Sequence, residues 1–384
     1  MTTKRTVGFG DAQAAPGEKA WGSLQVRQGD KSVRVAVGVI NGSSPGPHFV
    51  AIAGFHGAEL NGIAAIHSFF EKIDPTELSG TIFVVLCTNP RAAMMRSYAW
   101  PEDRHAELVE RYGDGPYPPA LAPEDKQRLN MQRLWPGRKG GLLAERVTHE
   151  IWTQAIHAPH RRADFVIDMH CYHRETLDAI VLSDEDMIPF GAASGIPVLL
   201  NQRYKPDTPF CTAHCRRAGV NALILESCGQ GCVSPDSAQK AERVLFNLAR
   251  YMKMLPGKPA LPEHALLVDP WLDDDIEGKN ATTSVAFECA LSAGLFVPRR
   301  SSWEIVEKDE VVGEVLDLYT GQVAQTVHAP VSGCLFNAGV GVGICEKGQR
   351  LIGVCIYEQV NPRRILNQHP YLDTGTSPGS SQTR

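Results

Sequence analysis

The 384-residue sequence lacks any uninterrupted apolar run of the ~18 residues that a membrane-spanning helix needs. It also lacks a basic excess, because 38 Lys and Arg residues stand against 43 Asp and Glu residues, for a net charge of -5. Proteins that bind nucleic acids or anionic membranes usually carry basic patches. No apolar segment follows the early basic residues Lys4 and Arg5, so no secretory signal is expected. These absences predict a cytoplasmic protein without a nucleic-acid or membrane partner.

The ten cysteines lack the regular spacing of a disulfide-rich secreted domain. Two pairs with three intervening residues, Cys211 with Cys215 and Cys228 with Cys232, are compatible with a metal or redox site. Structural zinc sites place such pairs on turns, whereas the segments here are expected to form a helix and a loop after a strand. We therefore interpret the cysteines as free and mostly buried thiols.

Apolar residues divide the chain into two parts with different periodicity. In residues 1–258, wholly apolar strands alternate with amphipathic helices, a pattern typical of an α/β sheet with helices on both faces. The Pro- and Gly-rich segment 256–264 ends this pattern, and short β-type runs with Gly turns follow in residues 265–360. We predict a mixed, mostly parallel sheet domain, an all-β domain and, in residues 369–384, a flexible tail.

A first candidate site lies where an apolar strand (48–55) ends and a helix begins. His56 and Glu59 are three residues apart there, and an imidazole and a carboxylate at this spacing can bind one metal ion. Open α/β sheets hold ligands at the carboxyl ends of their strands. The spacing also fits a solvated helix N-terminus with an acidic residue in its first turn, so the pair alone is a weak signal.

Polar residues also end two later strands that are otherwise apolar. His170 closes the strand DFVIDMH, and Asp168 shares its face by side-chain alternation, so Asp168 is placed to orient the imidazole. His173 is the competing histidine, but it lies past the strand. Glu226 ends the strand NALILE, where a carboxylate is costly unless it has a partner or a task such as activating water. Each residue taken singly also fits an ordinary strand-end side chain.

Five segments together resemble the succinylglutamate desuccinylase and aspartoacylase family, which shares the fold of the zinc carboxypeptidases. They stand in the family's order between residues 48 and 232, and their combination is far more specific than any one of them. The resemblance implies that His56, Glu59 and His170 hold one Zn²⁺ and that Glu226 is the general base and proton shuttle. The segments are GFHGAELNG, TNPRAAMMRSY, NMQRLWPG, DFVIDMH and LILESCGQG.

The resemblance also implies which residues bind the substrate. The family's Asp-Leu-Asn-Arg segment, which grips an amino-acid carboxylate, corresponds to NMQR here, with Arg133 kept and Gln132 where asparagine is usual. In the family, an arginine ten residues before the catalytic glutamate binds an acidic group. Arg216 has that spacing here, and the adjacent Arg217 is the alternative for this role. Arg96 is the nearest match to an arginine after the Asn-Pro turn. The implied substrate-binding residues are Asn89, Arg96, Tyr98, Gln132, Arg133 and Arg216.

Two longer segments are also interpreted through the resemblance. The stretch from Asn89 to Arg133 exceeds that of compact members, so residues 99–128 are expected to be an insertion beside the substrate site. The β domain resembles the family's C-terminal barrel-sandwich, which is related to biotinyl and lipoyl carriers, but the carrier lysine after HAPVSG is absent. His328 or Tyr319 of this domain is a candidate to reach the substrate.

These implications predict a zinc-dependent amidohydrolase with a carboxypeptidase-like α/β domain. Its substrate would be a small N-acylated amino acid or related amine that carries a carboxylate, and its products a carboxylic acid and the free amine. Ectoine-degradation deacetylases have the same two-domain layout, so an N-acetylated diamino acid is one candidate. The alternatives are a zinc carboxypeptidase acting on peptides and a zinc-binding protein without turnover. The oligomeric state is left open, with a homodimer as one candidate because relatives often form dimers.

Overall fold

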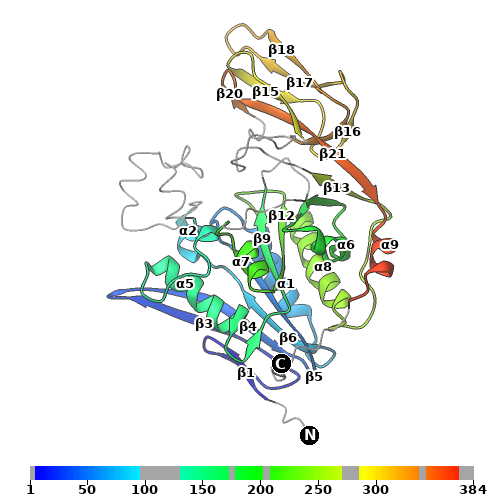
Figure 1. Cartoon of the computed structure of the whole chain (residues 1–384). Coiled ribbons are helices and arrows are strands. Elements are labelled where there is room, and N and C mark those ends of the chain that lie inside the picture. The colour runs from blue at the N-terminus through cyan, green and yellow to red at the C-terminus, as the bar shows by residue number, and fades with distance from the viewer. Residues whose placement is uncertain are drawn as a thin grey trace, which may run out of the picture.

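In the computed structural model, a larger domain has helices on both faces of a sheet, and a smaller β-rich domain projects from one edge of that sheet (Figure 1). The two ends of the described chain both lie on the larger domain, because the last helix returns to it from the smaller one. The structure describes residues 5–95, 130–172, 178–201, 208–269, 285–336 and 343–371.

The larger domain is built on a mixed sheet whose central strands are parallel, so that their carboxyl ends meet at one edge. In chain order its strands are β3 (Glu18–Gln28), β4 (Lys31–Asn41), β5 (Ser44–Ala53), β6 (Ser79–Val85), β9 (Phe165–Cys171), β10 (Ala179–Leu182), β11 (Val198–Asn201), β12 (Asn221–Ser227) and β13 (Ala265–Asp269). The short hairpin strands outside the sheet are β1 (Val7–Phe9), β2 (Ala12–Ala14), β7 (His157–Ala158) and β8 (Arg161–Arg162).

Helices connect the strands and cover both faces of the sheet. In chain order they are α1 (Asn61–Lys72), α2 (Pro90–Met95), α5 (Leu143–Ile151), α6 (Ile188–Ser194), α7 (Cys211–Arg217), α8 (Pro235–Tyr251) and α9 (Pro362–Gln368). In the described ranges, single turns of another geometry are the 3₁₀ turns η1 (Met131–Arg133) and η3 (Glu185–Met187) and the π turn η2 (Trp152–Ile156).

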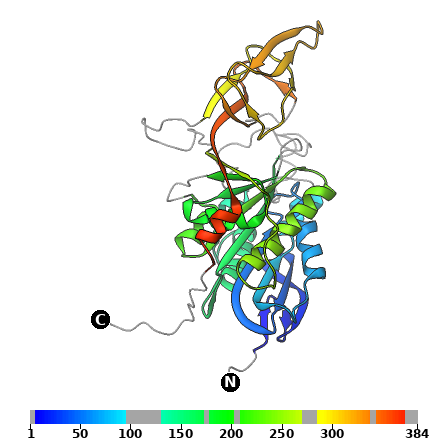
Figure 2. The same ribbon diagram turned by 90° about the vertical axis from the view of Figure 1, so that its right-hand side faces the viewer.

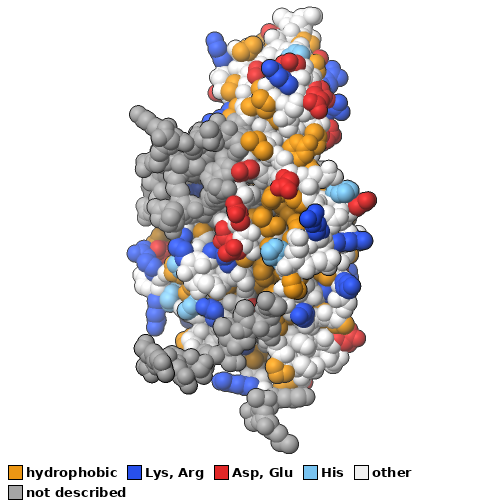
Figure 3. All heavy atoms as spheres, turned by 45° about the vertical axis from the view of Figure 1, so that its right-hand side comes forward, with side chains coloured by type: hydrophobic (Ala, Val, Ile, Leu, Met, Phe, Trp, Pro, Cys, Tyr) orange, Lys and Arg blue, Asp and Glu red, His pale blue; other side chains and the backbone are white. Residues whose placement is uncertain are grey.

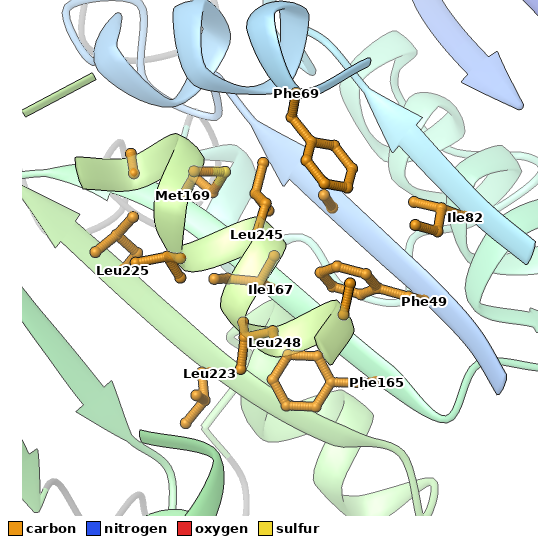
Figure 4. Packing of buried hydrophobic residues seen from close by; sticks show 14 of the residues in the cluster. Phe49, Phe69, Ile82, Phe165, Ile167, Met169, Leu223, Leu225, Leu245 and Leu248 are labelled. Atoms are coloured by element: carbon orange, nitrogen blue, oxygen red, sulfur yellow. The ribbon is translucent and has the colours of Figure 1, made fainter. Parts of the chain in front are cut away.

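Strand β9 shows how alternation separates the apolar core from the polar edge. Phe165, Ile167 and Met169 face α1 and α8, and Figure 4 shows them among the apolar side chains of those two helices. The intervening residues point to the opposite face, which α5 and α7 cover. Asp168 and His170 therefore lie on the second face, near the carboxyl end of the strand.

The smaller domain is joined to the sheet by one long strand, β21 (Arg350–Val360). Residues 356–360 of β21 pair with β13, and the residues before them pair with two strands of the smaller domain, so this strand belongs to both domains (Figure 2). The other strands of this domain are β14 (Val285–Cys289), β15 (Gly294–Pro298), β16 (Ile305–Val306), β17 (Val311–Leu316), β18 (Val323–His328), β19 (Gly333–Phe336) and β20 (Ile344–Cys345).

The structure confirms the predicted fold class, a mixed α/β sheet with helices followed by an antiparallel β region. Within the predicted β range 265–360, however, β13 is a strand of the large sheet, where it pairs with β11. The helix α9 after that range packs against α6 of the larger domain. Pattern alone assigned β13 to the second domain because helical periodicity stops before it, at 256–264.

Side chains of both charge signs are interspersed over the face of the molecule shown in Figure 3. Among the described residues, no helix is both long enough and apolar enough to cross a bilayer.

Helix α1 approaches β9 closely at Gly62, where an added Cβ would lie 2.7 Å from the Cβ of Met169. We predict that Gly62→Val lowers the free energy of unfolding by about 1–3 kcal/mol, because overpacking pushes α1 off the sheet. Denaturant unfolding measures the loss. Gly140→Val is the control, because an added Cβ meets nothing within 4 Å there; equal stability of the two variants would contradict the close approach.

Candidate metal centre

His56, Glu59 and His170 meet at the carboxyl edge of the sheet. The first two lie in the turn between β5 and α1, which leaves the strand through Gly54 at a φ of 70°. His170 lies near the end of β9. Nδ1 of His56 is 2.8 Å from Oε1 of Glu59, and Nδ1 of His170 is 2.8 Å from Oε2. All three side chains are buried, and their ligand atoms lie within 4.8 Å of one another.

The second nitrogen of each imidazole also faces an oxygen. Nε2 of His170 lies 2.9 Å from Oδ2 of Asp168, as an ionic contact without the alignment of a hydrogen bond. Nε2 of His56 lies 3.0 Å from Oδ1 of Asn130, which also accepts from the backbone N–H of Gln132 at 2.9 Å. Such partners fix the tautomer and orientation of metal-binding histidines.

This arrangement fits a cation between the three side chains. A neutral imidazole has one N–H and can donate to only one of its two oxygen neighbours. If Nε2 of His56 donates to Asn130, then Nδ1 and Oε1 of Glu59 are two acceptors at 2.8 Å, which is unfavourable unless a proton or a metal ion lies between them. Two imidazoles and one carboxylate are the protein ligands of many catalytic zinc sites. The donor set therefore fits a divalent metal ion.

The electrostatics of the cluster also favour a cation. Burial lowers the pKa of His170, but the carboxylates of Asp168 and Glu59 outweigh it and hold that pKa well above the ordinary value. Burial likewise raises the pKa of Glu59, yet His56 and His170 lower it to about 2. The buried site therefore keeps its carboxylate ionised and attracts positive charge, which protons or a metal ion can supply.

Glu226 lies beside the cluster on the neighbouring strand. It is paired in register with His170 across the parallel strands β12 and β9, so both side chains point to the same face. Burial, assisted by the negative charges of Glu59 and Asp168 and opposed by His170, raises the pKa of Glu226 to about 8. Among the described residues, none donates a hydrogen bond to its carboxylate. A carboxylate so placed can exchange a proton with a reacting group, and a nearby cation would lower its pKa.

Asn89 is bound to backbone groups on both sides of the ligand-bearing turn. Its Nδ2 donates to the carbonyl oxygen of Phe55 at 3.2 Å, and its Oδ1 accepts from the backbone N–H of Ala92 at 3.1 Å. Its own N–H donates to the carbonyl oxygen of Gly54. The fully buried side chain therefore fastens the loop that carries His56, and a contact with substrate stays a prediction.

Arg216 lies at the opposite end of the sheet from the cluster. Its guanidinium contacts Asp184 at 2.8 Å and Oδ1 of Asn221 at 2.7 Å. Asn221 begins β12, whereas Glu226 is near the end of that strand. Because each residue of a β-strand advances the chain by about 3.3 Å, Asn221 and Glu226 are about 16 Å apart. This placement corrects the substrate role that spacing alone gave Arg216. Neighbouring Arg217 donates to the carbonyl oxygen of Thr208.

Arg133 remains next to the cluster. It lies in the turn η1, whose first residue follows Asn130, the partner of His56. Its guanidinium lies over the ring of Phe210, 5.0 Å from the centroid, and no carboxylate pairs with it in the described part of the chain. Gln132, in the same turn, is half-buried. A half-buried arginine without an acidic partner is available for a carboxylate ligand.

Other sequence-predicted residues either lie elsewhere or fall outside the described residues. Tyr319 is 100% exposed at the tip of the hairpin β17–β18, and Nδ1 of exposed His328 contacts the carbonyl oxygen of Asp309. The structure brings neither to the cluster. Those outside the described residues are Arg96, Tyr98, His173 and the segment 99–128.

Sequence reasoning missed two residues of the site, Asn130 and Gln230. Asn130 binds the imidazole of His56, and Nε2 of Gln230 donates to Oε1 of Glu59 at 3.1 Å. Asn130 stands in the NMQR segment, at the place of the aspartate in Asp-Leu-Asn-Arg, so the motif contained a signal for it. Gln230 gave no signal, because a glutamine in a Gly-rich turn is normally solvated.

Comparison with known proteins supports a common fold and family. The family model of the succinylglutamate desuccinylase/aspartoacylase catalytic domain matches residues 45–252, more than half of the chain. Among curated proteins, none matches the sequence.

Solved structures with the same fold cover both domains. The succinylglutamate desuccinylase/aspartoacylase from Rhodobacter sphaeroides is 18% identical with a TM-score of 0.64, over 89% of this chain and 96% of that one. The product-bound ectoine utilization protein EutE (DoeB) from Ruegeria pomeroyi is 19% identical with a TM-score of 0.64, over 92% and 98%. An aspartoacylase family protein from Mesorhizobium loti has the same identity, TM-score and coverage. Since the family model matches the segment that contains the cluster and Glu226, the chain belongs to the succinylglutamate desuccinylase/aspartoacylase family.

Proposed function

We propose that the protein is a zinc-dependent amidohydrolase that cleaves the acyl–nitrogen bond of a small N-acylated amino acid or related amine. Family membership supports a hydrolase of acylated amino acids. The observation that carries the proposal is the convergence of Nδ1 of His56, Nδ1 of His170 and the carboxylate of Glu59, with Glu226 on the adjacent strand. This combination provides both a metal site and a proton-transferring carboxylate.

Each residue of the site has a defined task in this proposal. His56, Glu59 and His170 would hold Zn²⁺, which when bound acts as a Lewis acid and lowers the pKa of a bound water to ~7. The Glu226 carboxylate takes the proton of the attacking water and passes it to the departing amine nitrogen. Arg133 binds the substrate carboxylate through paired N–H donors and so places the amide carbon beside Glu226.

An assay of candidate substrates identifies the acyl group and the amine. A screen of N-acetyl, N-succinyl and N-formyl amino acids, N-acetylated diamino acids and short peptides, with amine release as the readout, tests the proposal directly. Release from N-acyl amino acids but not from peptides is expected. Cleavage of peptides alone would instead assign the chain to the carboxypeptidases.

Metal binding is predicted to strengthen as the pH rises. Without metal, the carboxylates raise the pKa of His170, so the proton on its Nδ1 must leave before a metal ion can bind. The dissociation constant for Zn²⁺ should fall about tenfold per pH unit for each proton released, up to that raised pKa. Titration calorimetry in buffers of different ionisation enthalpy measures both quantities. An affinity independent of pH, without proton release, would contradict the arrangement.

Glu226→Gln is predicted to abolish most turnover while the metal stays bound. The amide keeps the shape of the side chain but cannot take up the proton of water, so kcat should fall about 10²–10⁴-fold. Emission spectroscopy for zinc and an assay of amine release measure the two effects separately. An active variant would remove Glu226 from the role of base, and loss of zinc would make it a ligand instead.

Arg133→Lys is predicted to raise KM for a carboxylate substrate about 10–100-fold with a smaller effect on kcat, because lysine cannot offer two parallel N–H donors. Arg216→Lys is the matched control, since Arg216 pairs with Asp184 away from the cluster. Its KM should equal that of the wild type. A KM that rises only in the Arg216 variant would reverse the two assignments.

A further inference from the structure

Gln230 contacts two of the segments that form the site and lies in the turn that follows the third. It lies in the turn between β12 and α8, four residues after Glu226, and is only 9% exposed. Its Nε2 donates to Oε1 of Glu59 at 3.1 Å and to the carbonyl oxygen of Cys171, the residue after His170. One carboxamide thus joins the segments that carry Glu59, His170 and Glu226.

Further hydrogen bonds fasten this turn to the ligand loop, residues 54–60. The backbone N–H of Gly231 donates to the carbonyl oxygen of Ala58 at 2.6 Å. The buried side chain of Asn61, at the start of α1, donates to the carbonyl oxygen of Cys228. These hydrogen bonds hold the turn against the ligand loop and the start of α1, so the backbone that carries the Gln230 side chain is fixed beside the carboxylate of Glu59.

We propose that Gln230 is a positioning residue for the metal centre, which fixes the rotation of the Glu59 carboxylate and couples it to the turn that follows Glu226. The inference rests on the proposed function, because it requires a metal ion at the cluster. A carboxylate turns readily about its terminal torsion, and an N–H donor on Oε1 restricts that rotation. Outer partners of this kind strengthen metal binding by orienting the ligands.

A carboxamide suits this task better than a charged side chain. The site already holds the buried carboxylates of Glu59 and Asp168, and another carboxylate would repel them. A lysine or arginine at this place would neutralise Glu59 and compete with the metal ion for it. Gln230 donates a hydrogen bond and adds no charge. It therefore orients Glu59 without weakening the attraction of the site for a cation.

Gln230→Met tests the proposal, because methionine keeps the length of the side chain and removes the donor. The dissociation constant for Zn²⁺, measured by chelator competition, should rise about 10–100-fold. The visible absorption of the Co²⁺-substituted protein should shift, since it reports the ligand geometry. Gln325→Met is the matched control, because buried Gln325 donates to the carbonyl oxygen of Cys289 in the smaller domain. Both readouts should stay at wild-type values in this variant.

The outcomes separate a positioning role from a structural one. If Gln230 only supports the backbone at Cys171, the metal-free Gln230→Met protein melts earlier, but its Zn²⁺ affinity stays within about twofold of wild type and its Co²⁺ spectrum is unchanged. That result would overturn the proposal. If the Met variant does not fold, Gln230→Glu replaces it, because glutamate keeps the shape of the side chain but loses the N–H donor. An unchanged Co²⁺ spectrum of this variant would likewise overturn the proposal.

The wild-type protein distinguishes this inference from the function on which it rests. If it takes up neither Zn²⁺ nor Co²⁺, the proposed function and the role of Gln230 fail together. If it binds either metal and the Gln230 variants bind it equally well, only the role of Gln230 is withdrawn.

Discussion

The site depends on one buried carboxylate, that of Glu59. It is 3% exposed and lies between two imidazoles, each 2.8 Å away through Nδ1. An ionised carboxylate is stable at such depth only when partners satisfy both oxygens. Those partners are His56 in the ligand loop, His170 near the end of β9 and Gln230 in the turn after β12. Three segments that are distant in the sequence therefore meet at this carboxylate. The negative charge of Glu59, which requires these partners, also attracts a cation to the site.

The sheet supplies the precision that this meeting needs. Parallel strands β5, β9 and β12 end at one edge, and their apolar residues pack between α1 and α8 on one face and α5 and α7 on the other. Gly62 allows α1 to lie close to β9, and Asn89 fastens the loop before α1 to the neighbouring turn. Strand β9 thus carries His170, and a turn held at both ends carries His56 and Glu59. This is a favourable basis for a metal site, because misplacement by even 1 Å is costly in catalysis.

The sequence predicted what depends on local pattern and strand order. Apolar strands that alternate with helices indicated the α/β sheet, and polar residues at strand ends marked His170 and Glu226 as candidate site residues. Contacts between distant segments leave no local pattern in the sequence and were not predicted. Asn130 contacts His56 from 74 residues away in the chain, and Gln230 contacts Glu59 from 171 residues away. Chain spacing misled for Arg216, because the tight turn into β12 places it at the far edge, where Asp184 pairs with it.

Anomalous diffraction at the zinc absorption edge, from crystals of the protein loaded with zinc, tests the central claim most directly. The account predicts one strong peak per chain within bonding distance, about 2.0–2.2 Å, of Nδ1 of His56, Nδ1 of His170 and a carboxylate oxygen of Glu59. A peak at the thiols of Cys211 and Cys215, or no peak at the cluster, would contradict it.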